Sequence, residues 1–217
     1  MYTFQRFVNP PFSEITYIVK NEERECIVID PGGHHGEISD LIESDDLNLL
    51  GILLTHAHCD HVAGLMPIAK KFGAPIFVHP DEQSILEYSS VYWSFVAKGA
   101  PFHGPKWKDV EEFPSDELSL GRMRFQIRHT PGHTPGSCFV QCKNLVFTGD
   151  TLMKTSVGRT DLIGGDQKRL AETINNLPDY SDDTVFLPGH GTTFTNVELR
   201  TLNIEFNKIR NDKNIGD

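Results

Sequence analysis

The sequence predicts a layered α/β domain in which two β-sheets pack between helices. Short apolar runs of strand length come in two series along the chain, and helix-like stretches follow each series. The 217 residues are 38% hydrophobic and 23% charged, a composition typical of globular proteins. A chain of this length can bury roughly 70% of its unfolded surface. We therefore expect one α/β domain over residues 1–217.

The first series opens with two apolar runs, at residues 15–20 and 26–30, which the polar turn 21–24 joins into a strand pair. The pattern of residues 36–47 predicts a helix, and residues 51–55 form a short apolar run typical of a buried strand.

A short helix and a further strand complete this series. Residues 66–72 are predicted to be helical because Pro67 suits a first turn and Gly73 suits a helix end. The apolar run at residues 75–79 predicts the next strand.

The second series contains three apolar runs, at residues 123–128, 137–141 and 145–148, with a tight turn at 143–144 between the last two. Residues 184–187 predict a final core strand.

Two helices accompany the second series. The first covers residues 166–177, with Asp166 as its N-cap and an apolar face of Leu170, Ile174 and Leu177. The second opens with a capping box between Thr195 and Glu198 and is expected to run on as one helix. Its apolar stripe would consist of Leu199, Leu202, Phe206 and Ile209.

Residues 88–119 differ from the rest of the chain because they are aromatic-rich and irregular. Long irregular segments inside compact domains are usually functional. This insertion could form a lid or wall over a site, with Trp93 and His103 as candidate substrate-binding residues. The alternative is that its rings fill a gap in the core.

A dense cluster of metal-ligand side chains follows the strand at 51–55. His56, His58, Asp60 and His61 fall within six residues. In an extended segment the first three would project to one side, and a turn would let His61 join them. Imidazoles together with a carboxylate suit zinc or a similar divalent metal.

Three more segments end an apolar strand in a glycine beside a metal-type side chain, namely His133, Asp150 and His190. Loops at strand ends are where α/β proteins place reactive groups, and each glycine allows a sharp turn. The two groups together give seven candidate ligands. Since one catalytic metal uses three or four protein ligands, seven fit two ions with three ligands each and one shared carboxylate.

The motifs THAHCDHVAG, HTPGHTPGS, FTGDTL and LPGHG resemble the metal-binding motifs of the metallo-β-lactamase superfamily. With the preceding strand pair and the DPGG sequence at 30–33, the resemblance covers nearly the whole chain. It implies a four-layer αββα sandwich with the metal site at one edge.

Within the superfamily, Asp150 and the tract 156–165 resemble glyoxalase II (hydroxyacylglutathione hydrolase) and its short single-domain relatives. The resemblance implies that His56, His58 and His133 hold one metal, that Asp60, His61 and His190 hold the other, and that Asp150 bridges them. True β-lactamases lack that bridge, which disfavours antibiotic hydrolysis.

The implied activity is hydrolysis of a thioester or related acyl bond by a metal-bridging hydroxide. Asp60 and Asp150 would be the catalytic carboxylates, and Asp60 would orient the hydroxide. The cofactors would be two divalent ions, zinc first, with iron or manganese as alternatives.

The resemblance to glyoxalase II is weaker at the positions that contact glutathione in that family. Arg159 occupies the position of the family's basic glutathione contact, but Asp161 stands where a tyrosine is expected. Arg159 could therefore bind substrate, or it could form an ion pair with Asp161.

The main alternative is a persulfide dioxygenase, which this sequence also resembles. Such an enzyme would bind one iron through His56, His133 and Asp150 and would activate oxygen. The identity and number of the bound metals would distinguish the thioester hydrolase from the dioxygenase. A lactonase that uses the same metal centre and a metal-stabilised binding module are further alternatives.

Charge and hydropathy restrict the partners. The net charge of −10 disfavours nucleic acid. The sequence contains no apolar run of spanning length, and residues 1–7 show no apolar run of signal-peptide type, so we do not expect export. The four cysteines form no CxxC pair and suit reduced thiols. We expect a cytoplasmic enzyme that acts on a small-molecule thioester, without nucleic acid or membrane as partner; the sequence does not predict its oligomeric state.

Overall fold

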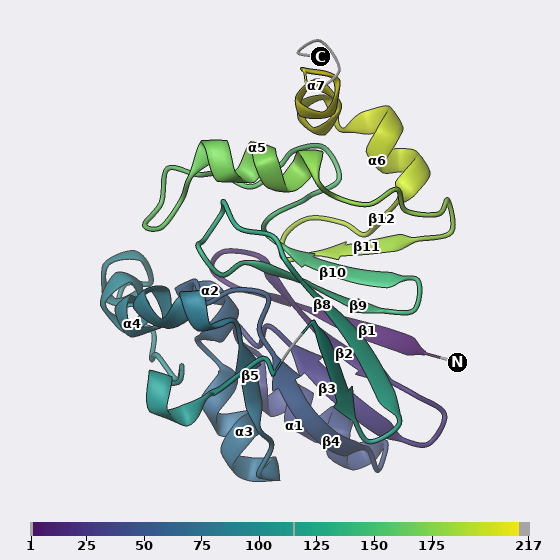
Figure 1. Ribbon diagram of the computed structural model, residues 1–217. Helices are drawn as coiled ribbons and strands as arrows, with labels where there is room; N and C mark the ends of the chain where they lie inside the picture. The colour runs from purple at the N-terminus through teal and green to yellow at the C-terminus, as the bar shows by residue number, and fades with distance from the viewer. Residues whose placement is uncertain (1, 115, 213–217) are drawn as a thin grey trace.

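The computed structural model describes residues 2–114 and 116–212 and shows two six-stranded sheets packed face to face between helices (Figure 1). The first sheet contains β1 (Thr3–Asn9), β2 (Glu14–Lys20), β3 (Glu25–Ile29), β4 (Asn48–Leu53), β5 (Ile76–Val78) and β6 (Glu111–Glu112), in that order. Its first three strands pair antiparallel, and β3 to β6 pair parallel.

The second sheet is ordered along the chain in the same way. It contains β7 (Glu117–Leu120), β8 (Met123–His129), β9 (Cys138–Cys142), β10 (Leu145–Gly149), β11 (Val185–Pro188) and β12 (Phe194–Thr195). All neighbouring strands pair antiparallel except β10 and β11, which are parallel.

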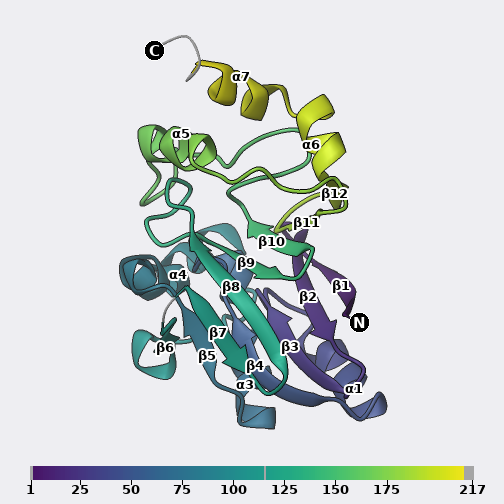
Figure 2. The ribbon, with the colours of Figure 1, turned by 45° about the vertical axis from the view of Figure 1, so that its right-hand side comes forward.

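Helices cover the outer face of each sheet (Figures 1 and 2). Those before the second sheet are α1 (His35–Ser44), α2 (Cys59–Val62), α3 (Leu65–Phe72), η1 (Pro80–Glu82), α4 (Gln83–Val96) and η2 (Trp107–Asp109). Those after β10 are α5 (Gln167–Asn175), α6 (Asn196–Leu202) and α7 (Ile204–Asp212). The four-layer αββα sandwich predicted from the sequence is therefore confirmed.

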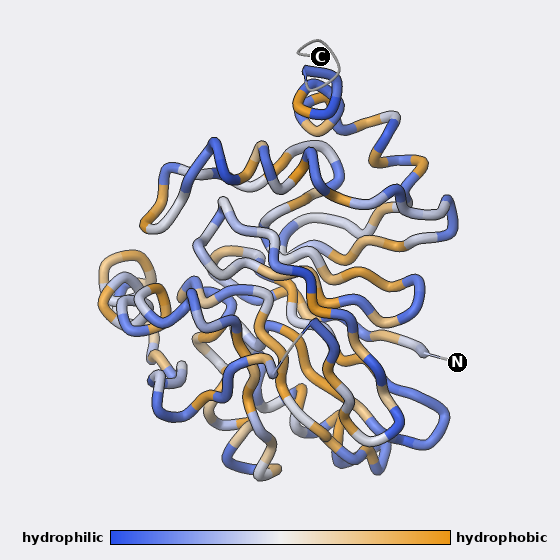
Figure 3. The backbone as a smooth tube through the Cα atoms, viewed as in Figure 1, coloured by the Kyte–Doolittle hydropathy of each residue, from blue (hydrophilic) through white to orange (hydrophobic). Residues whose placement is uncertain are grey.

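Three apolar clusters hold the layers together, because alternate strand residues point to opposite faces of each sheet. Between the sheets, Tyr17, Ile29 and Phe147 belong to a buried cluster contributed by both. On the outer faces, Val28 packs with the helices that follow β3, and Phe186 packs with those that follow β10. Figure 3 shows the matching pattern: hydrophobic residues are frequent along the strands, and hydrophilic residues are frequent in the turns between them.

Seven strands lie where the sequence predicts them, to within one residue at either end: β2, β3, β5, β8, β9, β10 and β11. The strand expected at 51–55 is β4, which begins and ends earlier, so Thr55 already belongs to the loop that follows it. The edge strand β1 was not predicted. Most of its residues are exposed, so it lacks the apolar alternation of a half-buried strand.

The expectation of an irregular segment over 88–119 is wrong for its first part. Helix α4 extends to Val96, and η2, β6 and the start of β7 lie further along the same segment. Helix α4 packs against α2 through the buried ring of Trp93, which contacts Phe12 and Phe102.

The prediction of one continuous final helix is also wrong. Asn203 interrupts it with an extended backbone between α6 and α7. Its buried side-chain amide donates hydrogen bonds of 2.9 Å to the carbonyls of Met153 and Ser156, and its Oδ1 accepts one from the Phe206 N–H. Leu202, expected in the apolar stripe, is 45% exposed as a consequence.

Among the described residues, no helix combines the length and apolar character needed to cross a membrane. The four cysteines are all free and buried, as expected for reduced thiols.

Candidate metal centre

The histidine-rich motif begins at Thr55, two residues past the end of β4. Asp30 holds this loop in place, because its carboxylate accepts hydrogen bonds from the Thr55 N–H (2.7 Å) and hydroxyl (2.5 Å). Helix α2 starts directly after His58, so Asp60 and His61 project from a helical turn. This turn brings the ring of His61 back to 4.0 Å from that of His56.

The other candidate ligands follow three strands of the second sheet. His133 lies in the loop after β8, Asp150 follows β10, and His190 follows β11. Two glycines make room for this convergence. A Cβ on Gly149 would meet Thr55 Oγ1 at 2.3 Å, and one on Gly189 would meet Asp150 Oδ1 at 2.4 Å.

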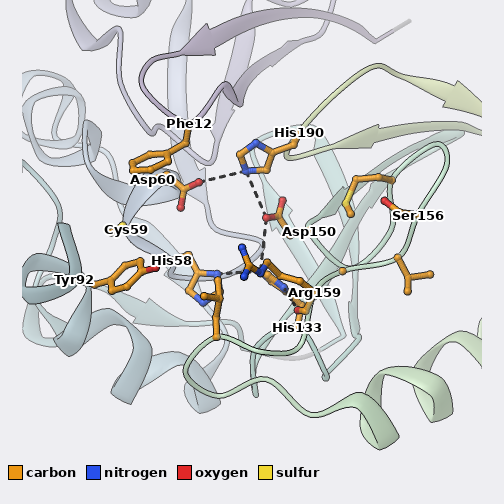
Figure 4. A pocket seen from close by; sticks show the side chains of 14 residues that line it. Phe12, His58, Cys59, Asp60, Tyr92, His133, Asp150, Ser156, Arg159 and His190 are labelled. Carbon is orange, nitrogen blue, oxygen red and sulfur yellow. Dashed lines mark hydrogen bonds and ion pairs between the residues drawn. The ribbon is translucent and has the colours of Figure 1, made fainter. Parts of the chain in front are cut away.

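The structure brings all seven sequence-predicted ligands together as two groups of three around one carboxylate. In His56, His58 and His133, one ligand atom from each lies within 4.8 Å of the others, and the same holds for Asp60, His61 and His190. Asp150 lies between the groups, as Figure 4 shows for His133 and His190. Its carboxylate oxygens are 3.5 Å from His61 Nε2, 3.6 Å from His133 Nε2 and 3.5 Å from His190 Nε2.

These side chains fit divalent metal ions. His56 Nε2, His61 Nε2 and Asp150 Oδ1 are buried and make no hydrogen bond. Buried polar atoms almost always have a partner, so a group of such atoms directed at one space indicates a site that binds a ligand. Imidazole nitrogens with carboxylate oxygens are the donors that zinc and iron take in proteins.

Burial keeps three of the histidines neutral. It lowers the pKa of His58 to about 3, aided by His133, and it holds the pKa of His56 well below the ordinary value, aided by His61. Burial likewise lowers the pKa of His133. A neutral imidazole offers the lone pair that a metal requires.

The opposite shifts occur around Asp150. Burial disfavours its charge, but His61 and His190 outweigh burial and hold its pKa well below the ordinary value. Burial also opposes protonation of His61, yet the neighbouring Asp150 and Asp30 raise its pKa well above the ordinary value. Asp150 is therefore a half-buried anion that positive charge stabilises.

Residues behind the ligands fix their orientation, as outer-shell partners do in metal sites. His61 Nδ1 lies 3.0 Å from Asp30 Oδ2, and His133 Nδ1 donates to the Arg159 carbonyl at 2.8 Å. Glu82 is a supporting residue that the sequence did not predict: its carboxylate accepts hydrogen bonds from the N–H of Ala57, next to His58, and from the N–H of Gly136, three residues after His133. A single glutamate in a polar segment of the sequence gives no sign that its side chain will be buried in this role.

Five of the seven candidate ligands line a cavity of about 470 Å³, namely His58, Asp60, His133, Asp150 and His190. Phe12, Tyr92, Leu162 and Arg159 form part of its wall. The residues labelled in Figure 4 come from both halves of the chain and point into one space.

Two of the three predicted substrate contacts do not line this cavity. Trp93 is 5% exposed and belongs to the core, with its indole N–H donating to the Ala100 carbonyl. His103 instead lies with its ring against His35. Trp93 therefore fills the core, as the alternative interpretation predicted. Tyr92 is the residue of the aromatic segment that lines the cavity.

Arg159 lines the cavity, and it forms the ion pair considered in the sequence analysis. Its Nε and Nη2 donate to the two carboxylate oxygens of Asp161 at 2.7 and 2.8 Å. Both side chains are mostly exposed, so this pair contributes little to stability.

Comparison with known proteins places these features in a family. The sequence model of the Metallo-beta-lactamase superfamily matches residues 9–190. A relative from Haemophilus influenzae, named hydroxyacylglutathione hydrolase GloC, is 34% identical over 191 residues, which cover 85% of this chain and 88% of that protein.

Two solved structures extend the comparison. The BLEG-1 B3 metallo-beta-lactamase superposes with a TM-score of 0.84 at 30% identity, covering 93% of this chain and 98% of that one. TTHA1623, solved in a di-iron-bound form, superposes with a TM-score of 0.79 at 32% identity, covering 92% and 98%.

Proposed function

The chain belongs to the metallo-beta-lactamase superfamily, and we propose that it is a binuclear metal-dependent hydrolase that cleaves thioesters or related acyl bonds. The observation that carries the proposal is the position of Asp150, whose carboxylate lies within 3.6 Å of ligand atoms from both groups of three. The di-iron form of TTHA1623 and the name of the Haemophilus relative support two metals and an acyl thioester, respectively.

In this proposal His56, His58 and His133 would hold one ion, Asp60, His61 and His190 would hold the other, and Asp150 would be a ligand to both. Two such ions lower the pKa of a shared water towards 7 and polarise a carbonyl oxygen. Zinc is the first expectation, with iron or manganese as alternatives.

Asp60 has a second task in the proposed reaction. Its carboxylate lines the cavity, and its Oδ2 lies 3.3 Å from His190 Nε2. Burial disfavours the charge of Asp60, but His190 and His61 outweigh burial and lower its pKa. An ionised carboxylate at this position can orient an attacking water and accept its proton at Oδ2.

The test is metal content per chain combined with a substrate panel. Protein expressed without added metal is analysed by plasma mass spectrometry and assayed with S-lactoylglutathione, other acyl thioesters and a chromogenic cephalosporin. Nearly two equivalents of metal with thioester hydrolysis support the proposal. One equivalent of iron with oxygen uptake on glutathione persulfide would establish the dioxygenase instead, and cephalosporin cleavage without thioesterase activity would make the enzyme a β-lactamase.

The bridging role has its own variant, Asp150→Asn. An amide removes the shared anion, so both ions should bind at least about tenfold more weakly while the circular dichroism spectrum is unchanged. Asp161→Asn, which alters a carboxylate beside the same cavity, is the matched control and should keep its metal. Full metal content in Asp150→Asn would contradict the bridge.

A further inference from the structure

A second, apolar lobe of about 240 Å³ opens beside the metal centre. His58, Cys59, Tyr92 and Leu162 line both this lobe and the metal cavity, so the two spaces share a wall. The remaining lining residues are Ile85, Tyr88, Ser89, Asp161 and Ile163. The lobe thus lies between α4 and the loop that follows Arg159.

The lobe presents apolar and aromatic surface, and some of it is exposed. Ile163 is 52% exposed and Tyr88 is 38% exposed, which places two large apolar side chains at its mouth. Exposed apolar groups that gather around a concave space are typical of ligand sites.

Polar groups inside the lobe are already engaged. The Ser89 hydroxyl lies within hydrogen-bond distance of the carbonyls of Ala57 (2.5 Å) and Ile85 (2.8 Å). The described residues that line this lobe include neither lysine nor arginine, so an anionic ligand group would find no cationic side chain there.

Arg159 is the one lysine or arginine among the described residues that line either space, and it already forms an ion pair. Arg159 lies in the wall of the metal cavity, and Asp161 holds its guanidinium in a two-point ion pair. Among the described lining residues, therefore, no unpaired cationic side chain is available for a carboxylate or phosphate. The apolar lobe thus offers no cationic side chain to an anionic group and suits an uncharged one.

We propose that this lobe binds the acyl chain of the substrate and selects uncharged, apolar acyl groups longer than acetyl. The inference rests on the proposed thioester hydrolysis. Common carrier thiols bear carboxylates or phosphates, so the acyl chain is the part of a thioester that suits an apolar space without cations. With the carbonyl at the metal centre, the chain would pass His58 and Tyr92 to reach Ile85 and Ile163.

The first test measures binding without turnover. Ketone analogues, in which CH₂ replaces the thioester sulfur and the thiol part is uncharged, are titrated into the metal-loaded protein by calorimetry. Each methylene that is fully buried is worth up to about fourfold in affinity. Because the lobe is partly open, we expect the hexanoyl analogue to bind at least about tenfold more tightly than the acetyl analogue.

The matched variants are Ile163→Asp and Val197→Asp. Both replace an exposed apolar residue, since Val197 is 45% exposed on α6, outside the lobe. Ile163→Asp should reduce the hexanoyl advantage to below about threefold and leave acetyl binding unchanged. Val197→Asp should behave as the wild type. Equal binding of the two analogues by the wild-type protein would overturn the inference.

The same pair of acyl groups is then compared as thioesters through kcat/KM. Hydrolysis without chain-length preference would overturn the acyl lobe and leave the proposed function standing. Tight hexanoyl binding with no hydrolysis of any thioester would leave the lobe standing and would overturn the proposed function.

Discussion

Glu82 is a buried carboxylate that ties together two loops of the candidate metal centre. Its Oε2 accepts a hydrogen bond from the Ala57 N–H and its Oε1 accepts one from the Gly136 N–H, each at 2.7 Å. Burial raises its pKa, and the hydrogen bonds it accepts offset part of that shift. One fully buried side chain therefore sets the spacing between the backbone beside His58 and the backbone after His133.

We predict that Glu82→Gln weakens both folding and metal binding. The glutamine amide must turn its NH₂ toward one of two N–H donors, which leaves a buried donor unpaired at a cost of about 1–3 kcal/mol. Urea unfolding measures the first effect, and competition with a chelator measures the second. Glu87→Gln, on the exposed face of the helix α4 that follows Glu82, should match the wild type in both. Unchanged metal affinity in Glu82→Gln would reduce this residue to a folding role.

Helix α4 is the element that the sequence predicted least well, because most of it lies in the segment that was expected to be irregular. Seven strands and the ligand motifs were predictable because apolar periodicity and the histidine spacing are local properties. Residues 83–96 are rich in serine, valine and aromatic residues, which are only moderate helix formers. Tertiary packing on α2 stabilises this helix, and no local pattern reports such packing. For the same reason, the supporting roles of Asp30 and Glu82 could not be told from those of surface carboxylates.

The two neighbouring rings of α4 should give opposite phenotypes. Trp93 is buried in the core, so Trp93→Ala should lower the free energy of unfolding by about 3–5 kcal/mol while KM and metal content stay near wild type. Tyr92 is half-buried and lines both cavity lobes, so Tyr92→Ala should raise KM severalfold at a smaller cost in stability. Denaturant unfolding and steady-state kinetics on both variants check this. A rise in KM confined to Trp93→Ala would restore the lid interpretation.

At the scale of the whole molecule, the metal centre lies where the two sheets meet. His56, His58, Asp60 and His61 follow a strand of the first sheet, whereas His133, Asp150 and His190 follow strands of the second. Hydrogen bonds also join the sheets at this end. The Ile15 N–H donates to the Gly189 carbonyl, and the Cys138 N–H donates to the Thr55 carbonyl, both at 2.8 Å. Ions held by both ligand groups and by Asp150 would connect the two halves of the sandwich directly.

Removal of metal should therefore destabilise both sheets together. A ligand that binds only the folded state at 1,000 times its Kd contributes about 4 kcal/mol, and each kcal/mol shifts Tm by about 2–4 °C for a chain of this size. Chelation should then lower Tm by about 8–16 °C per site, and added zinc should restore it. Hydrogen exchange followed by mass spectrometry should show lost protection at residues 54–61 and also at 130–137 and 189–191. Loss confined to the first segment would mean that the metals do not bridge the sheets, and an unchanged Tm would mean that these side chains hold no metal.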